Sequence, residues 1–166
     1  ADPHRDEDNN GTADECEAVG NGSRCDEFKQ LCTLPYQERV AKPIVWYYTE
    51  GSDMAYYDAT RDATSQWDTA MRVAVQSSRY AECKRVGKST CDQEFPVYPG
   101  QQDMNEDALN LTAEINACKA GRIRVEYGGD PQRCDALADE IATTRGYHPA
   151  VAAIAKQPRM VVLLSL

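Results

Sequence analysis

The spacing of apolar residues changes several times along the chain, and each change predicts a different element. β-Branched and aromatic residues are dense over 44–49, which predicts a strand. Apolar residues then recur at helical spacing from about 54 to 80, so we expect a long helix with Ser52 or Asp53 as its N-cap. We expect its apolar face and alternate side chains of the strand to pack into the core. That face consists of Met54, Ala59, Ala63, Trp67, Ala70, Met71, Ala74 and Val75.

Later segments predict further helices and strands. Residues 122–127 alternate between polar and apolar side chains, which predicts a half-buried strand. Asp130 and Pro131 are residue types preferred where a helix begins, and Gly146 is the type preferred after its end. The remaining elements are helices over about 104–118 and from residue 131, a short helix over 149–156, and a strand within 159–166. Together they predict a mixed α/β (α+β) fold, with a small mixed sheet and three main helices.

Composition divides the chain into three parts. Residues 1–15 are acidic and rich in Asn and Gly, so we expect a disordered tether. Residues 16–41 are short and rich in loops, and we expect disulfides to staple this segment. Residues 42–166 then form the α/β domain. Because the apolar run at 159–166 stops without a turn or polar tail, we expect this domain to be truncated at its C-terminus.

The charge balance limits the classes of partner. The 166 residues carry a net charge of -9, and acidic residues are concentrated near the N-terminus. The chain has no run of Lys or Arg to meet a phosphate backbone, so we expect no nucleic-acid partner. We also predict no transmembrane segment, and we expect any signal segment to be removed or to lie upstream.

Seven cysteines predict disulfides and an oxidising compartment. None has the Cys-x-x-Cys spacing of zinc ribbons or redox sites, so we expect an exported protein that is secreted, periplasmic or at the cell surface, and the sequence leaves lipid anchoring open. We predict the pairs Cys83–Cys91 and Cys118–Cys134, because each flanks a compact element. The N-terminal three would then hold one bond and one leftover thiol. The cysteines are Cys16, Cys25, Cys32, Cys83, Cys91, Cys118 and Cys134.

Residues that carry catalytic chemistry are sparse. The two histidines, His4 and His148, cannot form a metal site alone, and His148 precedes a proline as a helix N-cap does. No Gly-x-Ser-x-Gly elbow is present. We expect most of the carboxylates to be exposed on helix surfaces. Glu126 with Asp130 or Asp135 is a candidate pair for acid–base chemistry. We therefore assign no catalytic, cofactor-binding or metal-binding residue within these 166 residues.

Two segments carry a resemblance to a known family. Lys42-Pro-Ile-Val-Trp-Tyr-Tyr-Thr-Glu50, followed by a helix containing Ala63-Thr-Ser-Gln-Trp67, resembles the opening of a metzincin-like, exported bacterial zinc-dependent metalloprotease or lipoprotein. The likeness covers roughly residues 30–80. It implies a first strand and first helix, with zinc held by a His-Glu-x-x-His motif and a third histidine. No position here matches those residues, so the resemblance places zinc beyond Leu166.

Three hypotheses follow. The leading hypothesis is the N-terminal segment of an exported zinc-dependent metalloprotease, lacking the zinc site and inactive on its own, whose full chain acts on a protein or peptide. The alternative is a non-catalytic, disulfide-bonded cell-envelope or secreted binding module with Trp46, Tyr48 and Tyr98 as anchors. The third is a self-standing hydrolase with a carboxylate site.

Overall fold

The computed structural model describes residues 25–26, 31–32, 37, 41–99 and 106–165. In these residues helices outweigh strands, and the predicted mixed α+β class is confirmed. In chain order the elements are β1 (Cys25–Asp26), β2 (Leu31–Cys32), β3 (Ile44–Tyr48), η1 (Met54–Tyr56), α1 (Tyr57–Arg85), α2 (Cys91–Glu94), α3 (Glu106–Lys119), η2 (Val125–Tyr127), α4 (Pro131–Arg145), α5 (Pro149–Lys156) and β4 (Val161–Ser165).

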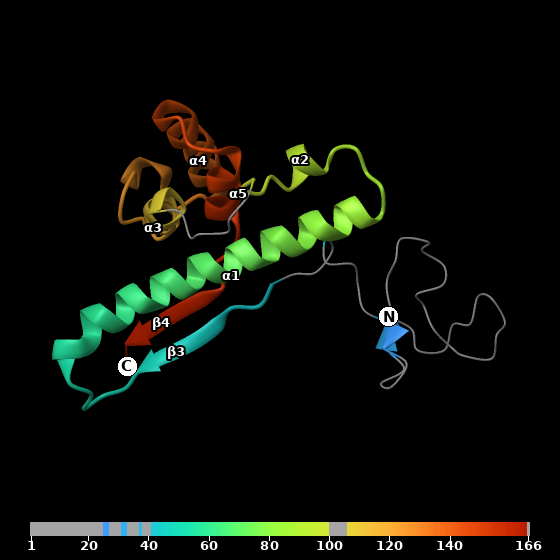
Figure 1. The fold of residues 1–166 in the computed structure, drawn as a ribbon. Coiled ribbons are helices and arrows are strands. Elements are labelled where there is room, and N and C mark those ends of the chain that lie inside the picture. The colour runs from blue at the N-terminus through green and yellow to red at the C-terminus, as the bar shows by residue number, and fades with distance from the viewer. Residues whose placement is uncertain (1–24, 27–30, 33–36, 38–40, 100–105, 166) are drawn as a thin grey trace.

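Strands β3 and β4 form a two-stranded parallel sheet, although they are far apart in the sequence. Ile44 pairs with Val161 and Tyr48 with Ser165. The connection between them runs through every helix of the body (Figure 1). Helix α1 contacts β4 as well as α3 and α5, so it lies between the sheet and the other helices. The small β1–β2 pair is antiparallel.

The apolar core belongs to α3, α4 and α5. Leu111 and Ile115 of α3 pack with Leu137 of α4 and Val151 of α5, and all four are buried. The predicted Cys118–Cys134 disulfide is confirmed; it joins α3 to α4 and is fully buried. The core therefore forms where three helices present apolar faces to one another.

Helix α1 buries the opposite face from the one predicted. Its buried residues are mostly polar, whereas much of the predicted apolar face is exposed, with Trp67 57% exposed. Alternate residues of β3 do not fill the core either, because Ile44, Trp46 and Tyr47 are about half exposed. The prediction was wrong because hydrogen bonds to α5 and β4 hold the polar face inward. The buried residues of α1 are Thr64, Asp68, Thr69, Arg72, Gln76, Glu82 and Cys83.

The predicted N-caps agree with the structure, as does the end of α4 before Gly146, whereas α1 continues to Arg85, past the end predicted near residue 80. Asp53 caps η1, where its Oδ1 accepts the N–H of Ala55 at 2.9 Å. The Oδ1 of Asp130 accepts the N–H of Gln132 at 2.8 Å, and α4 ends at Gly146 with φ 68°. Nδ1 of His148 accepts the N–H of Ala150 at 3.1 Å, so this histidine is the N-cap of α5.

The strand predicted over 122–127 is wrong. Residues there form a turn with the 3-10 helix η2, bracketed by Arg124 at φ 48° and Gly128 at φ 60°. A side chain at Gly129 would lie 3.0 Å from the carbonyl oxygen of Lys119, so this segment folds closely over the end of α3. Alternation failed because left-handed residues break an extended backbone, and the buried partners of Ile123 and Tyr127 are helices rather than a sheet.

Several predictions fall on residues outside this description. The tether at 1–15 and the side chains of Cys16, Cys25 and Cys32 are among them. The domain boundaries also stay predictions. The second predicted disulfide, Cys83–Cys91, is confirmed at the end of α1. Within the described residues, no helix is long and apolar enough to cross a membrane.

Candidate functional site

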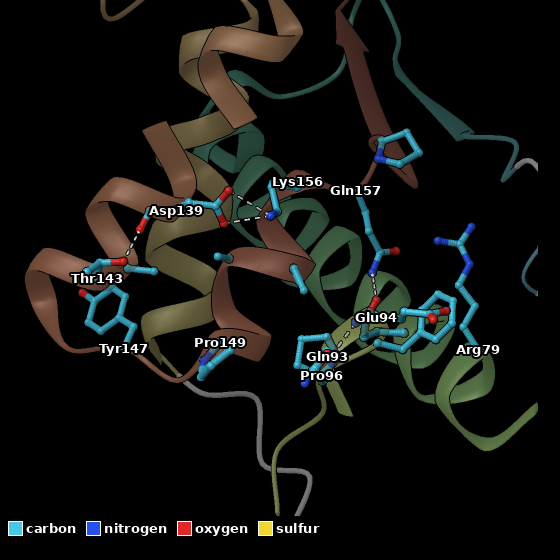
Figure 2. A pocket seen from close by; sticks show the side chains of 16 residues that line it. Arg79, Gln93, Glu94, Pro96, Asp139, Thr143, Tyr147, Pro149, Lys156 and Gln157 are labelled. Carbon is cyan, nitrogen blue, oxygen red and sulfur yellow. Dashed lines mark hydrogen bonds and ion pairs between the residues drawn. The ribbon is translucent and has the colours of Figure 1, made fainter. Parts of the chain in front are cut away.

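A cavity of about 610 Å³ opens between α1, the segment after α2, and helices α4 and α5 (Figure 2). Gln76 and Arg79 contribute from α1, and Asp139 and Thr143 from α4. Pro149 and Lys156, the first and last residues of α5, also line the cavity. The cavity has the size of sites that take small molecules, roughly 300–1,000 Å³.

One wall of the cavity carries a charged pair. Nζ of Lys156 lies 2.7 Å and 3.1 Å from the two carboxylate oxygens of Asp139. The pair joins the last residue of α5 to α4, and both side chains are partly exposed. Exposed pairs of this kind contribute about 0–1 kcal/mol. The pair therefore contributes little to the stability of the fold and places one positive and one negative group on this wall.

Another part of the wall carries two linked amides, of which Figure 2 labels Gln157. Nε2 of Gln157 donates to Oε1 of Gln76 at 3.0 Å, and Nε2 of Gln76 donates to the carbonyl of Pro96 at 3.1 Å. Oε1 of Gln157 is buried and has no hydrogen-bond partner within the described residues. The wall thus offers an acceptor for a donor on a bound molecule.

The lining residues support binding better than catalysis. The hydroxyl of Thr143 donates to the backbone oxygen of Asp139 at 2.8 Å. Neither this hydroxyl nor that of Tyr147 is hydrogen-bonded to a histidine or carboxylate side chain in the part of the chain that the structure describes. Without a base, a hydroxyl is a poor nucleophile. Among the described residues, the cavity therefore offers polar groups for a ligand, with no base hydrogen-bonded to either of these hydroxyls.

Asp68 and Arg72 of α1 form a buried ion pair, and Arg72 contacts Gln157 of the cavity lining. The sequence analysis did not predict this pair. Oδ2 of Asp68 accepts hydrogen bonds from Arg72 Nη2 at 2.8 Å and Asn116 Nδ2 at 3.2 Å. Oδ1 accepts the backbone N–H groups of Met160 and Val161 at 2.6 Å and 3.0 Å. One carboxylate of α1 therefore holds α3 and the start of β4.

Arg72 makes the complementary contacts on the same helix. Its Nη1 donates to the carbonyl oxygens of Ala155 and Gln157 at 3.0 Å and 2.6 Å, and its Nη2 donates to Oδ1 of Asn116 at 2.8 Å. A cation is favourable at the C-terminal carbonyls of a helix, here α5. Burial lowers the pKa of Arg72, and the adjacent Asp68 carboxylate opposes that shift.

The sequence held a signal for this pair. Asp68 and Arg72 stand four residues apart, the spacing at which opposite charges meet on a helix. Exposed pairs with the same spacing are common, so the spacing alone does not indicate burial. The mostly small and polar residues around them, which include Thr64 and Thr69, were the further cue.

Neither histidine forms a metal site with other described residues. His148 uses Nδ1 as a helix cap, and its ring lies 5.2 Å from that of Tyr98. His4 lies outside the described residues. Across residues 41–99 and 106–165 and the short described pieces before them, no group of three or more His, Cys, Asp or Glu side chains could hold a metal ion. The described residues therefore do not fit zinc.

The three predicted anchors do not form one surface. Trp46 is half exposed and lines a small cavity of about 70 Å³ with Trp67. The ring of Tyr48 contacts that of Tyr57 edge to face at 5.2 Å, and its hydroxyl donates to the carbonyl of Asp53. Tyr98 packs against the helical core instead. Only Trp46 presents a large free area.

Local contacts account for the candidate carboxylates. Asp130 caps α4, and Asp135 lies 2.7 Å from Nζ of Lys119. The carboxylate of Glu126 lies 3.9 Å from Arg124. These separate pairings give no support to an acid–base pair.

Lys84, near the end of α1, and Lys88, in the loop before α2, are also engaged locally. Nζ of Lys84 lies 2.9 Å from Asp92, and Nζ of Lys88 lies 3.9 Å from Glu94. The carboxylate of Asp92 raises the pKa of Lys84 through a hydrogen bond. These two lysines therefore offer little free charge to an external anion.

Comparison of the whole chain with protein-family models, curated proteins and solved structures gave no match, so the geometry above and the resemblance in the sequence carry the functional argument.

Proposed function

We propose that the chain is the N-terminal part of an exported zinc-dependent metalloprotease and supplies a scaffold for its sheet. In this role the segment is inactive on its own. The resemblance over β3 and α1 is the starting point. The disulfides of the body are compatible with an oxidising compartment.

The incompletely covered parallel sheet is the observation that carries this proposal. Parallel sheets normally have both faces covered, and a two-stranded sheet is only marginally stable alone. Here Val45, Tyr47 and Leu164 are 40–56% exposed, although they lie in β3 and β4. Both outer strand edges are also open in the described residues. Such a sheet is suited to extension by further strands and to cover by another layer.

By the resemblance, zinc would be held by residues downstream of this segment. Because the described residues do not fit the metal, we assign none of them a role in hydrolysis. Their proposed work is positional: Asp68 and Arg72 fix β4 against α1, and β4 would in turn direct the strand that joins it.

Zinc content and peptidase activity of the complete gene product test this proposal. We expect stoichiometric zinc by elemental mass spectrometry and casein hydrolysis that stops with 1,10-phenanthroline and returns with added zinc. The isolated 166-residue chain is the control, with neither zinc nor hydrolysis. A complete gene product without zinc and without hydrolysis would refute the proposal.

The exposed aromatic residues also favour a second candidate, a non-catalytic binding module. Tyr56 and Trp67 are 67% and 57% exposed, and Trp67 lines a small cavity together with Trp46 of β3. Aromatic residues commonly anchor protein interfaces. In that case, the metal-free 166-residue chain itself would bind a protein from its native compartment, and Trp67→Ala would weaken the binding.

A further inference from the structure

A second groove, of about 530 Å³, lies between α1 and α3 and shares no residue with the cavity described above. Figure 1 shows α3 along the N-terminal half of α1, and the two helices are in contact. Arg122 follows the end of α3, and Arg159 precedes β4. Both line the groove, so two cations from separate segments border one space.

These two arginines differ from the others in the described residues. The side chains of Arg122 and Arg159 form no hydrogen bond or ion pair there, whereas the side chain of every other described arginine has a partner. The chain has 27 acidic residues against 18 basic ones, so an arginine without a carboxylate is unexpected. The free guanidinium donors are therefore available to an anion from outside the chain.

Arg159 also lies close enough to the buried Arg72 for the two cations to repel each other. Burial is the main cause that lowers the pKa of Arg72, and the nearby Arg159 charge lowers it further. A bound anion would relieve this repulsion. Of the acids on the surrounding elements, Asp62 is paired with Arg61, and Asp68 with Arg72.

A buried hydroxyl supplies the third feature of the groove. Thr112 is 2% exposed, and its Oγ1 has no hydrogen-bond partner in the described residues. By contrast, Thr60, Thr64 and Thr69 of α1 and Thr143 of α4 each donate to the carbonyl four residues earlier. Thr112 lines the groove, so its hydroxyl is left for a ligand oxygen.

We propose that this groove binds the carboxylate or phosphate of a small hydroxylated molecule between Arg122 and Arg159. Guanidinium groups match the geometry of both anions. The side chains of Asn110 and Gln66 are available for hydroxyl groups, and the volume suits a molecule of sugar size. This proposal is independent of the protease assignment.

Titration of the 166-residue chain by two-dimensional amide NMR tests the groove. The probes are glucuronate, glucose 6-phosphate and neutral glucose, at low ionic strength. We expect saturable shifts of α1 and α3 amides with at least one anion and none with glucose. Glucuronate alone would identify a carboxylate ligand and glucose 6-phosphate alone a phosphate ligand. No saturable shift with either anion would overturn the proposal.

Variants separate the groove from general charge effects. Arg122→Gln and Arg159→Gln should each weaken binding about tenfold, the scale of a lost charged hydrogen bond. Arg124→Gln is the matched control, because Arg124 is exposed but does not line the groove. This variant should bind the anion with unchanged affinity. Thr112→Val should weaken binding and Thr112→Ser should restore it. Equal affinity in the double variant Arg122→Gln/Arg159→Gln would overturn the proposal even if Thr112→Val fails to fold.

Discussion

Helices α3–α5 and the unit formed by α1 with the β3–β4 sheet are built in opposite ways. The three helices bury leucine, isoleucine and valine, as most cores do. The α1–sheet unit instead buries Asp68 and Arg72 while Ile44, Trp46 and Trp67 stay half exposed. The helical part therefore carries its own apolar core. The sheet depends on specific polar links and leaves apolar surface exposed.

Breaking the polar link should have the largest effect. Asp68→Ala leaves Arg72 buried without its partner, and losing one member of a buried ion pair costs about 3–5 kcal/mol. We expect a fall of that size in the free energy of unfolding, measured with urea. The double variant Asp68→Leu/Arg72→Met should lose less, because it leaves no buried charge. A loss below about 1 kcal/mol in Asp68→Ala would contradict the importance of this link.

Two isoleucines provide a matched test of the two regions. Ile115 is 0% exposed in α3 and Ile44 is 48% exposed in β3. Ile115→Ala should lower the free energy of unfolding by about 2–5 kcal/mol, the usual result for a buried isoleucine. Ile44→Ala should cost about 1 kcal/mol or less, since little area is lost from the interior. Equal losses by urea unfolding would remove the contrast.

The two confirmed disulfides should differ slightly. Cys118–Cys134 spans 16 residues and Cys83–Cys91 spans 8. By loop entropy, replacing both cysteines of the longer pair with alanine should cost about 3 kcal/mol, and of the shorter pair about 2.5 kcal/mol. Thermal unfolding of the two double variants gives the comparison. A clearly larger loss for the shorter pair would show that packing, rather than loop closure, dominates.

The smallest effect concerns pH. Burial raises the pKa of Tyr98 from 10.0 to about 12, and Asp107 adds to the shift. The folded state thus holds this proton when the unfolded state has released it, and the stability contribution is lost as pH rises from 10 towards 12. The free energy of unfolding of the Tyr98→Phe variant should decline less with pH over that window than that of the parent chain. Parallel pH profiles of the variant and the parent chain would contradict this assignment.

Local signals in the sequence predicted much of the helical part. Asp130, Pro131 and Gly146 mark the ends of α4 because caps depend on nearby backbone groups. Disulfide pairs across short loops were likewise predictable. These features need no knowledge of distant partners.

Features that depend on distant partners were missed. The spacing of Ala63 and Trp67 predicted a buried apolar face, but Asp68 and Arg72 bond to backbone groups more than 80 residues away, and those groups decide which face turns inward. The groove at Arg122 and Arg159 likewise joins segments that only the fold brings together.

Hydrogen exchange by mass spectrometry tests the central claim, that the β3–β4 sheet is completed by the rest of an exported protease. We predict fast exchange of the β3 amides and of the β4 amides after Val161 in the 166-residue chain, and strong protection of the same amides in the complete gene product. Helices α3–α5 and the Met160 and Val161 amides, which bond to Asp68, should be protected in both. Equal, strong protection of β3 and β4 in the 166-residue chain would contradict the account.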